Sequence, residues 1–117
     1  MNNNAAHTLL CNQIMLAIGG LPRVRVFPMK VGAARVSATG QVVKFGTKGM
    51  ADLLAIVGPY HLWIEVKTGR GVLSEDQQNF RETICRIAGD QHHIVARSVE
   101  DAVGAVEQLQ KQGRGNA

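Results

Sequence analysis

Acidic residues are missing from the first 51 positions of this 117-residue chain, where six basic residues occur. The rest of the chain carries seven basic and nine acidic residues, so positive charge is concentrated in the amino-terminal part. Such a segment repels itself unless an anionic partner binds to it. This distribution favours a surface that binds nucleic acid, with six candidate contacts: Arg23, Arg25, Lys30, Arg35, Lys44 and Lys48.

Several other features are scarce, and each absence excludes a class of protein. Five aromatic residues are too few for a platform that stacks single-stranded bases. No apolar run approaches the roughly 20 residues that a membrane-spanning helix needs, and the first residues do not resemble a secretory signal. The two cysteines, Cys11 and Cys85, are predicted to be free thiols of a cytoplasmic protein, and no spacing of Cys and His residues suggests a metal site.

The length predicts a single domain over residues 1–117, with frayed ends at about 1–4 and 111–117. Apolar periodicity, glycines and prolines divide the chain into predicted helices and strands. Helices are expected at 5–19, 74–88 and from 99 onward, and strands at 23–27, 35–37, 42–45, 53–57, 62–66 and 92–96. This order predicts an α/β fold in which helices flank both faces of a mixed β-sheet.

Three charged residues are predicted to meet at one end of this sheet. Asp52 precedes the strand at 53–57, and Glu65 and Lys67 lie at the end of the next apolar run. If these strands pair as a hairpin, both carboxylates and the ammonium group come together. Two carboxylates hold a hard cation such as Mg²⁺, which activates water and neutralises charge on a phosphate, and a lysine stabilises the same charge. The alternative is a plain ion pair between Glu65 and Lys67 on a solvated face.

The order and spacing of several short motifs resemble the PD-(D/E)XK nuclease superfamily over nearly the whole chain. Within it, the chain is similar to small stand-alone VRR-NUC (virus-type replication-repair nuclease) proteins of phages and bacteria. The matching motifs are Val31-Gly32-Ala33-Ala34-Arg35, Phe45-Gly46-x-x-Gly49, Asp52, Glu65-Val66-Lys67-Thr68, Gly71, Ser74-x-x-Gln77-x-x-Phe80 and Arg97-Ser98-Val99-Glu100-Asp101. The resemblance implies a restriction-endonuclease-like fold and a Mg²⁺ or Mn²⁺ ion held by Asp52, Glu65 and the Val66 backbone carbonyl, with Lys67 as the catalytic lysine.

Two further residues have two interpretations each. Gln77 lies three residues after Ser74, which is the spacing of a helix capping box; in the resembling family, this glutamine belongs to the active site. The first helix of that family usually opens with a metal-binding glutamate, but this chain has His7 near that position. His7 either binds the metal or a water on it, or is an ordinary surface residue at the start of a helix.

The function implied by the resemblance is that of a metal-dependent endodeoxyribonuclease. Stand-alone members act as homodimers on branched DNA, including four-way junctions, in bacterial or phage-infected cells. The sequence leaves two alternatives open. One is a DNA-binding module that kept the fold but lost activity with the missing helix glutamate. The other is a structural or inhibitor-like phage protein without affinity for DNA.

Overall fold

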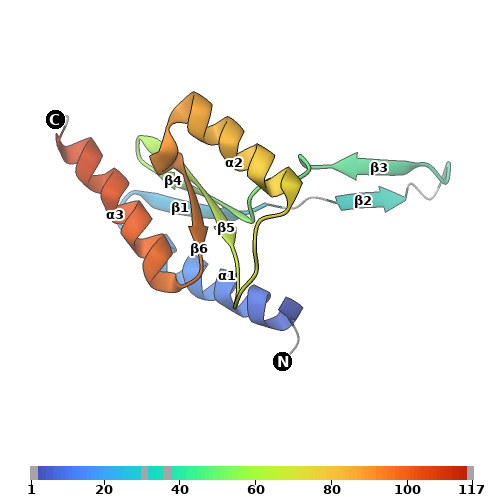
Figure 1. Ribbon diagram of the computed structural model, residues 1–117, viewed down its shortest axis with the longest axis horizontal. Helices are drawn as coiled ribbons and strands as arrows, with labels where there is room; N and C mark the ends of the chain where they lie inside the picture. The colour runs from blue at the N-terminus through green and yellow to red at the C-terminus, as the bar shows by residue number, and fades with distance from the viewer. Residues whose placement is uncertain (1–2, 30–31, 36–37, 116–117) are drawn as a thin grey trace.

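A four-stranded mixed sheet forms the centre of the computed structural model, which describes residues 3–29, 32–35 and 38–115 (Figure 1). Its strands are β1 (Val24–Pro28), β4 (Leu53–Val57), β5 (Tyr60–Val66) and β6 (His93–Ala96), in this spatial order. Neighbouring strands run antiparallel from β1 to β5, whereas β6 is parallel to β5. The predicted α/β class with a mixed sheet is confirmed.

Three α-helices cover the two faces of this sheet. α1 (Asn3–Gly19) and α3 (Val99–Gly115) pack on one face and touch each other, and α2 (Glu75–Ala88) lies on the other (Figure 1). Because side chains alternate along a strand, every second residue of β4 and β5 points toward α1 and α3. These residues and the inner sides of both helices form the core, whose buried members include Ile14, Ile18, Leu53, Leu62, Ile64, Val66, Val106 and Leu109. The predicted helices on both faces are confirmed.

α2 covers its face of the sheet only partly. None of its residues is buried, and its Phe80 ring stands edge-on to the ring of Trp63 in β5, with 5.1 Å between the centroids. Ile87 follows the apolar periodicity of the helix but is 73% exposed, because α2 lies alone on this face. The helix is therefore attached mainly by its contacts with β5, with β6 and with the short 3₁₀ turn at Asp90–His92.

The helix ends differ from those predicted. α1 begins at Asn3 rather than at residue 5, and α3 continues to Gly115, so the predicted frayed end at 111–117 is helical as far as Gly115. Gly113 lies close to the ring of Tyr60, so the polar end of α3 packs against the β4–β5 turn. No helix within the described part of the chain is long and apolar enough to span a membrane.

A second, two-stranded sheet projects from one end of the molecule. It is a hairpin of β2 (Gly32–Arg35) and β3 (Val42–Phe45), with Gly40 at a positive φ of 70° in the turn region. This confirms the predicted hairpin, although its first strand lies at 32–35 instead of 35–37. The hairpin follows β1 and precedes β4, and Pro28 pairs with Leu53. The chain therefore leaves and rejoins the main sheet at the end where Asp52 lies (Figure 1).

Between the hairpin and β4, Gly49 packs directly on the first turn of α2. Its φ of +81° favours glycine, and a Cβ atom at this position would overlap the backbone of Asp76. A 3.4 Å ion pair between Lys48 and Asp76 lies beside this contact, but both side chains are exposed, so it adds little stability. The close approach of Gly49 therefore positions the start of α2 relative to Asp52.

Substitution Gly49→Ala should destabilise the protein by about 1–3 kcal/mol, because the added methyl group strains the backbone and pushes α2 away. The matched control is Gly104→Ala in α3, where an added Cβ atom meets no other atom within 4 Å. This second change should stabilise the protein by about 0.5–1 kcal/mol. Urea-unfolding midpoints of both variants, compared with that of the wild type, test the contact. Equal midpoints for Gly49→Ala and Gly104→Ala would show that the contact between residue 49 and α2 does not require glycine.

Candidate active site

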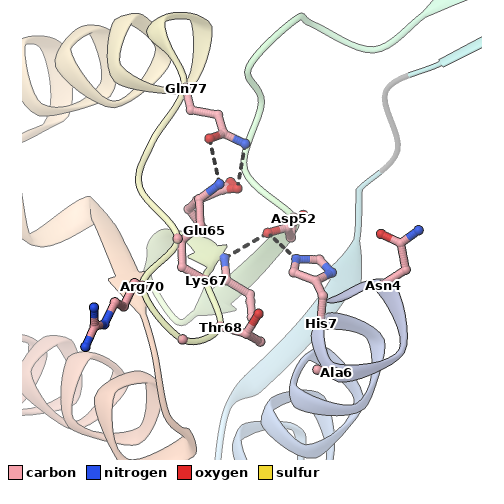
Figure 2. Close-up of a pocket in the computed structure, with 12 residues that line it drawn as sticks. Asn4, Ala6, His7, Asp52, Glu65, Lys67, Thr68, Arg70 and Gln77 are labelled. Atoms are coloured by element: carbon pink, nitrogen blue, oxygen red, sulfur yellow. Dashed lines mark hydrogen bonds and ion pairs between the residues drawn. The ribbon is translucent and has the colours of Figure 1, made fainter. Parts of the chain in front are cut away.

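An open pocket of about 600 Å³ lies at the end of the sheet where β4 begins and β5 ends (Figure 2). The first turns of α1 and α2 complete its walls. Its lining contains every residue predicted to be catalytic or to bind metal, namely His7, Asp52, Glu65, Val66, Lys67 and Gln77. Residues that are far apart in the sequence thus share one surface.

Asp52 and Glu65 are cross-strand neighbours. The register pairs Leu53 with Ile64, which places Asp52 opposite Glu65, as expected for a hairpin of β4 and β5. The Asp52 Oδ2 atom accepts a 2.8 Å hydrogen bond from the Val66 backbone N–H. This bond fixes the Asp52 carboxyl group against the end of β5, beside that of Glu65.

The Glu65 side chain is buried, with only 2% of the residue exposed. Its Oε1 atom accepts a 3.1 Å hydrogen bond from Gln77 Nε2, whereas its Oε2 atom has no hydrogen-bond partner among the described residues. Burial raises the pKa of Glu65 to about 8; the negative charge of Asp52 adds to this effect, and Lys67 opposes it. The two carboxyl groups therefore need a proton or a cation between them.

Gln77 faces the pocket and caps α2 at the same time. Its Oε1 atom accepts hydrogen bonds from Lys67 Nζ at 2.8 Å and from the Ser74 backbone N–H at 2.9 Å. The Ser74 hydroxyl accepts a 3.2 Å hydrogen bond from the Gln77 backbone N–H, which completes the capping box. The predicted capping box is confirmed, and the same side chain connects Lys67 to Glu65.

Lys67 forms no direct ion pair with Glu65 in the described part of the chain; instead, both side chains form hydrogen bonds with the Gln77 amide (Figure 2). The plain ion pair considered from the sequence is therefore wrong. An ammonium group has three N–H donors, and Gln77 accepts from one of them. Lys67 thus keeps donors for an anion in the pocket.

His7 reaches the pocket from α1. Its Nε2 atom lies 3.2 Å from Asp52 Oδ2, so His7 is not an isolated surface residue. Cys11 follows one turn later, and its Sγ atom is 3.9 Å from each ring nitrogen of His7. The sequence analysis did not predict this grouping, in which ligand atoms of His7, Cys11 and Asp52 lie within 4.8 Å of one another. The signal was the spacing of four residues, which places His7 and Cys11 on one helix face.

The oxygen atoms around Asp52 and Glu65 suit a hard divalent cation. Mg²⁺ and Mn²⁺ prefer carboxylate and carbonyl oxygen ligands. Two carboxyl groups lie together here, and one of them has an oxygen atom that no described group satisfies. Val66 presents its backbone to the pocket, because its side chain is buried in the core. Asp52, Glu65 and the Val66 carbonyl are therefore a fitting set of metal ligands.

Two of the predicted DNA-contacting residues lie away from this pocket. Val24, between Arg23 and Arg25, pairs with Val57 at the opposite end of β4 from Asp52. At about 3.4 Å per strand residue, this places Arg25 roughly 14 Å and Arg23 roughly 20 Å along the sheet from Asp52. The structure therefore does not bring Arg23 and Arg25 to the candidate site.

The other predicted DNA contacts belong to the hairpin end of the molecule. Lys48 precedes β4 and forms its exposed ion pair with Asp76 at the start of α2. Arg35 and Lys44 are in the β2–β3 hairpin, where only their backbone is described. Lys30 lies outside the described residues. All four positions belong to the segment between β1 and β4, which leaves and rejoins the main sheet at the end where the pocket lies.

Arg70 is a basic residue of the pocket that the sequence did not single out. It belongs to the loop 68–71 after Lys67, and its side chain points away from the two carboxyl groups (Figure 2). The Arg97 guanidinium donates a 3.3 Å hydrogen bond to the Gly69 carbonyl and so supports this loop. The two glycines around Arg70 were the available signal, but such a loop is equally common as a simple connector.

The raised pKa of Glu65 predicts a pH dependence of stability in metal-free protein. The folded state holds the Glu65 proton up to about pH 8, whereas the unfolded chain releases it near the ordinary value of 4.5. Because the folded state binds more protons between these values, stability should fall on the order of a few kcal/mol as the pH rises through this window. Glu65→Gln should remove this loss, whereas Glu82→Gln on the exposed side of α2 should keep it.

The measurement is chemical denaturation in EDTA at several pH values between about 5 and 8. Each variant is compared with the wild-type protein, so that contributions from other titrating groups cancel. Parallel stability curves for the wild type and Glu65→Gln would mean that the Glu65 carboxyl group ionises normally in the folded protein.

Comparisons with known proteins do not identify a family or a function for this chain. No protein-family model, no curated protein and no solved structure matches this chain. The function is therefore argued from the residues that converge at the end of β4 and β5.

Proposed function

We propose that this protein is a divalent-metal-dependent endodeoxyribonuclease that hydrolyses phosphodiester bonds of DNA. The observation that carries the proposal is the buried Glu65 carboxyl group, which has an oxygen atom without a partner among the described residues and lies beside Asp52 in an open pocket. Lys67, held through Gln77, adds a positive charge at the same place. Two carboxylates and a lysine are the groups that metal-assisted phosphodiester hydrolysis uses.

Each residue of the pocket has a defined part in this chemistry. Asp52, Glu65 and the Val66 carbonyl would hold Mg²⁺ or Mn²⁺. When bound, the ion would supply Lewis-acid polarisation of a phosphate oxygen and activation of a water molecule. Gln77 orients the Lys67 ammonium group toward the pocket, where its free N–H groups would stabilise the negative charge that develops on the phosphate.

The charge distribution of the chain supports DNA as the substrate. The acid-free amino-terminal part includes the β2–β3 hairpin, which projects from the same end of the sheet as the pocket (Figure 1). Arg35, Lys44 and Lys48 in this region, and Arg70 at the pocket, would contact phosphates, which every duplex offers. These contacts alone select no particular DNA structure.

The resemblance to stand-alone VRR-NUC proteins extends the proposal to branched DNA. We propose that four-way junctions are a preferred substrate and that the protein acts as a homodimer in the cytoplasm of bacterial or phage-infected cells. A two-fold axis would supply one active site for each of two cleaved strands.

A DNA-binding module without cleavage activity is the second candidate. The observation that favours it is His7, which contacts Asp52 where the resembling family usually has a metal-binding glutamate. Calorimetric titration with Mn²⁺ or Mg²⁺ separates the two candidates, because such a module has no need to bind either ion.

Glu65→Gln should abolish cleavage while leaving folding and DNA binding intact. Losing a ligand of the activating ion removes several kcal/mol of transition-state stabilisation, which corresponds to at least about a 100-fold slower reaction. The assay uses labelled duplex and four-way-junction DNA with Mg²⁺, Mn²⁺ or EDTA, and DNA binding is measured separately in EDTA. Glu82→Gln, which removes an exposed carboxylate of α2, should cleave as the wild-type protein does.

The outcomes separate the candidates. Wild-type cleavage rates in the Glu65→Gln variant would overturn the assignment of the active site. A wild-type protein that binds junctions but never cleaves them would favour the DNA-binding module. A protein that binds no DNA at all would favour a structural or inhibitor-like role.

The combined substitution of Arg35→Ala and Lys44→Ala should weaken DNA binding at any sequence. Each lost phosphate contact should reduce the slope of log affinity against log salt concentration by about one unit. The control removes two positive charges elsewhere through Arg86→Ala and Lys111→Ala, on the exposed sides of α2 and α3. Binding titrations at several salt concentrations give the slopes; an unchanged slope in the hairpin variant would place the DNA surface elsewhere.

A further inference from the structure

A second group of ligand atoms lies on the α1 side of the pocket. His7 and Cys11 occupy successive turns of α1, and both lie next to the Asp52 carboxyl group. The His7 Nε2 atom is 3.2 Å from Asp52 Oδ2 and 3.9 Å from Cys11 Sγ. Nitrogen, sulfur and oxygen donors are thus gathered from two elements that meet only in the folded protein.

The spacing of these atoms fits a small tetrahedral metal ion. Zn²⁺ binds nitrogen, oxygen and thiolate sulfur at about 2.0–2.3 Å, so its ligand atoms lie roughly 3.3–3.7 Å apart. The two separations at His7, 3.2 and 3.9 Å, lie just outside this range, and all three donors lie within 4.8 Å of one another. Small side-chain rotations of Cys11 and Asp52 would bring the donors to bonding distance.

The chemistry of this group differs from that of the Asp52–Glu65 pair. Imidazole and thiolate favour Zn²⁺ and related soft or borderline ions, whereas Mg²⁺ prefers oxygen ligands alone. Three protein ligands also leave the fourth position of a tetrahedral Zn²⁺ ion open to water. The side chains of His7 and Asp52 are 36% and 27% exposed, so an ion can reach them from the pocket.

We propose that His7, Cys11 and Asp52 form a Zn²⁺-binding site that shares Asp52 with the Mg²⁺ or Mn²⁺ site. Zn²⁺ in this site would withdraw Asp52 from the other ion and so inhibit cleavage. The binding of Zn²⁺ stands independently of the nuclease activity, whereas the inhibition rests on the proposed function.

Binding exchanges protons and hydrogen bonds in a defined way. The Cys11 thiol loses its proton to solvent as the thiolate binds the ion. The proton that His7 Nε2 shares with Asp52 in the metal-free protein passes through solvent to Nδ1, so that Nε2 of neutral His7 can donate its lone pair to the ion. The hydrogen bond between His7 and Asp52 is lost and replaced by bonds from both residues to the ion. Burial and the charges of Asp52 and Glu65 raise the pKa of Cys11 to about 11, and the same two negative charges attract a cation.

The test titrates metal-free protein with Co²⁺ in the absence of DNA, because Co²⁺ reports the coordination of a Zn²⁺ site. One equivalent of Co²⁺ should produce a thiolate-to-cobalt charge-transfer band, and added Zn²⁺ should remove it. Cys11→Ser should lose the band and bind Zn²⁺ at least about tenfold more weakly, since even outer partners of a metal site contribute that much. Cys85→Ser is the matched control, because Cys85 is the other free, half-buried cysteine and lies on α2.

A second variant keeps the test independent of any folding defect in Cys11→Ser. His7→Asn should retain a helix at α1 by circular dichroism and still bind Zn²⁺ at least about tenfold more weakly. Absence of the band from the wild-type protein, its survival in Cys11→Ser, or its loss in Cys85→Ser would each overturn the Zn²⁺ site.

The inhibitory role is read from the Mn²⁺-supported cleavage of DNA. Zn²⁺ at one equivalent should slow cleavage by the wild-type protein and by Cys85→Ser, and should have at least about a tenfold smaller effect on Cys11→Ser. Equal inhibition of all three proteins would overturn the competition for Asp52. A Co²⁺ band without any nuclease activity would support the Zn²⁺ site and reject the proposed function. Cleavage without a Co²⁺ band would support the proposed function and reject the Zn²⁺ site.

Discussion

Two carboxyl groups placed side by side at a partly enclosed strand end constrain the rest of this structure. The antiparallel register of β4 and β5 sets Asp52 opposite Glu65, and the burial of Glu65 removes the water that would otherwise stabilise its charge. Ionising both groups there is unfavourable without a positive partner. α1 and α2 converge on the pair, with His7 against Asp52 and Gln77 against Glu65.

The nearest lysine is held so that it does not neutralise this pair directly. The neutral Gln77 amide accepts from Lys67 and donates to Glu65, which keeps the ammonium group oriented, while Glu65 Oε2 has no hydrogen-bond partner in the described part of the chain. Because Gln77 also completes the cap of α2, the start of this helix and the geometry of the pocket depend on one side chain. The close contact of Gly49 with the first turn of α2 adds a steric limit to the same arrangement.

The residues predicted correctly from the sequence follow local rules. Strand alternation and a short turn suffice to place Asp52 beside Glu65, and the capping-box spacing is enough to place Gln77 in the first turn of α2. The sequence did not predict Cys11 and Arg70 near the pocket, because the position of Cys11 depends on how α1 meets the sheet and that of Arg70 on how a glycine-containing loop folds. The polar end of α3 was predicted to be frayed for a similar reason, since its packing on the β4–β5 turn is a long-range contact that the sequence does not indicate.

The nature of the Asp52–Glu65 pair as a cation site is tested most directly by carboxyl-carbon NMR of glutamate-labelled protein. Glu65→Gln identifies the signal of Glu65, and its chemical shift is followed against pH in EDTA and in excess Mg²⁺. We expect a pKa of about 8 without the ion, from burial and the charge of Asp52, and a clearly lower pKa with it, since a bound cation favours the carboxylate. A Glu65 pKa that is the same with and without Mg²⁺ would contradict a metal site at this pair.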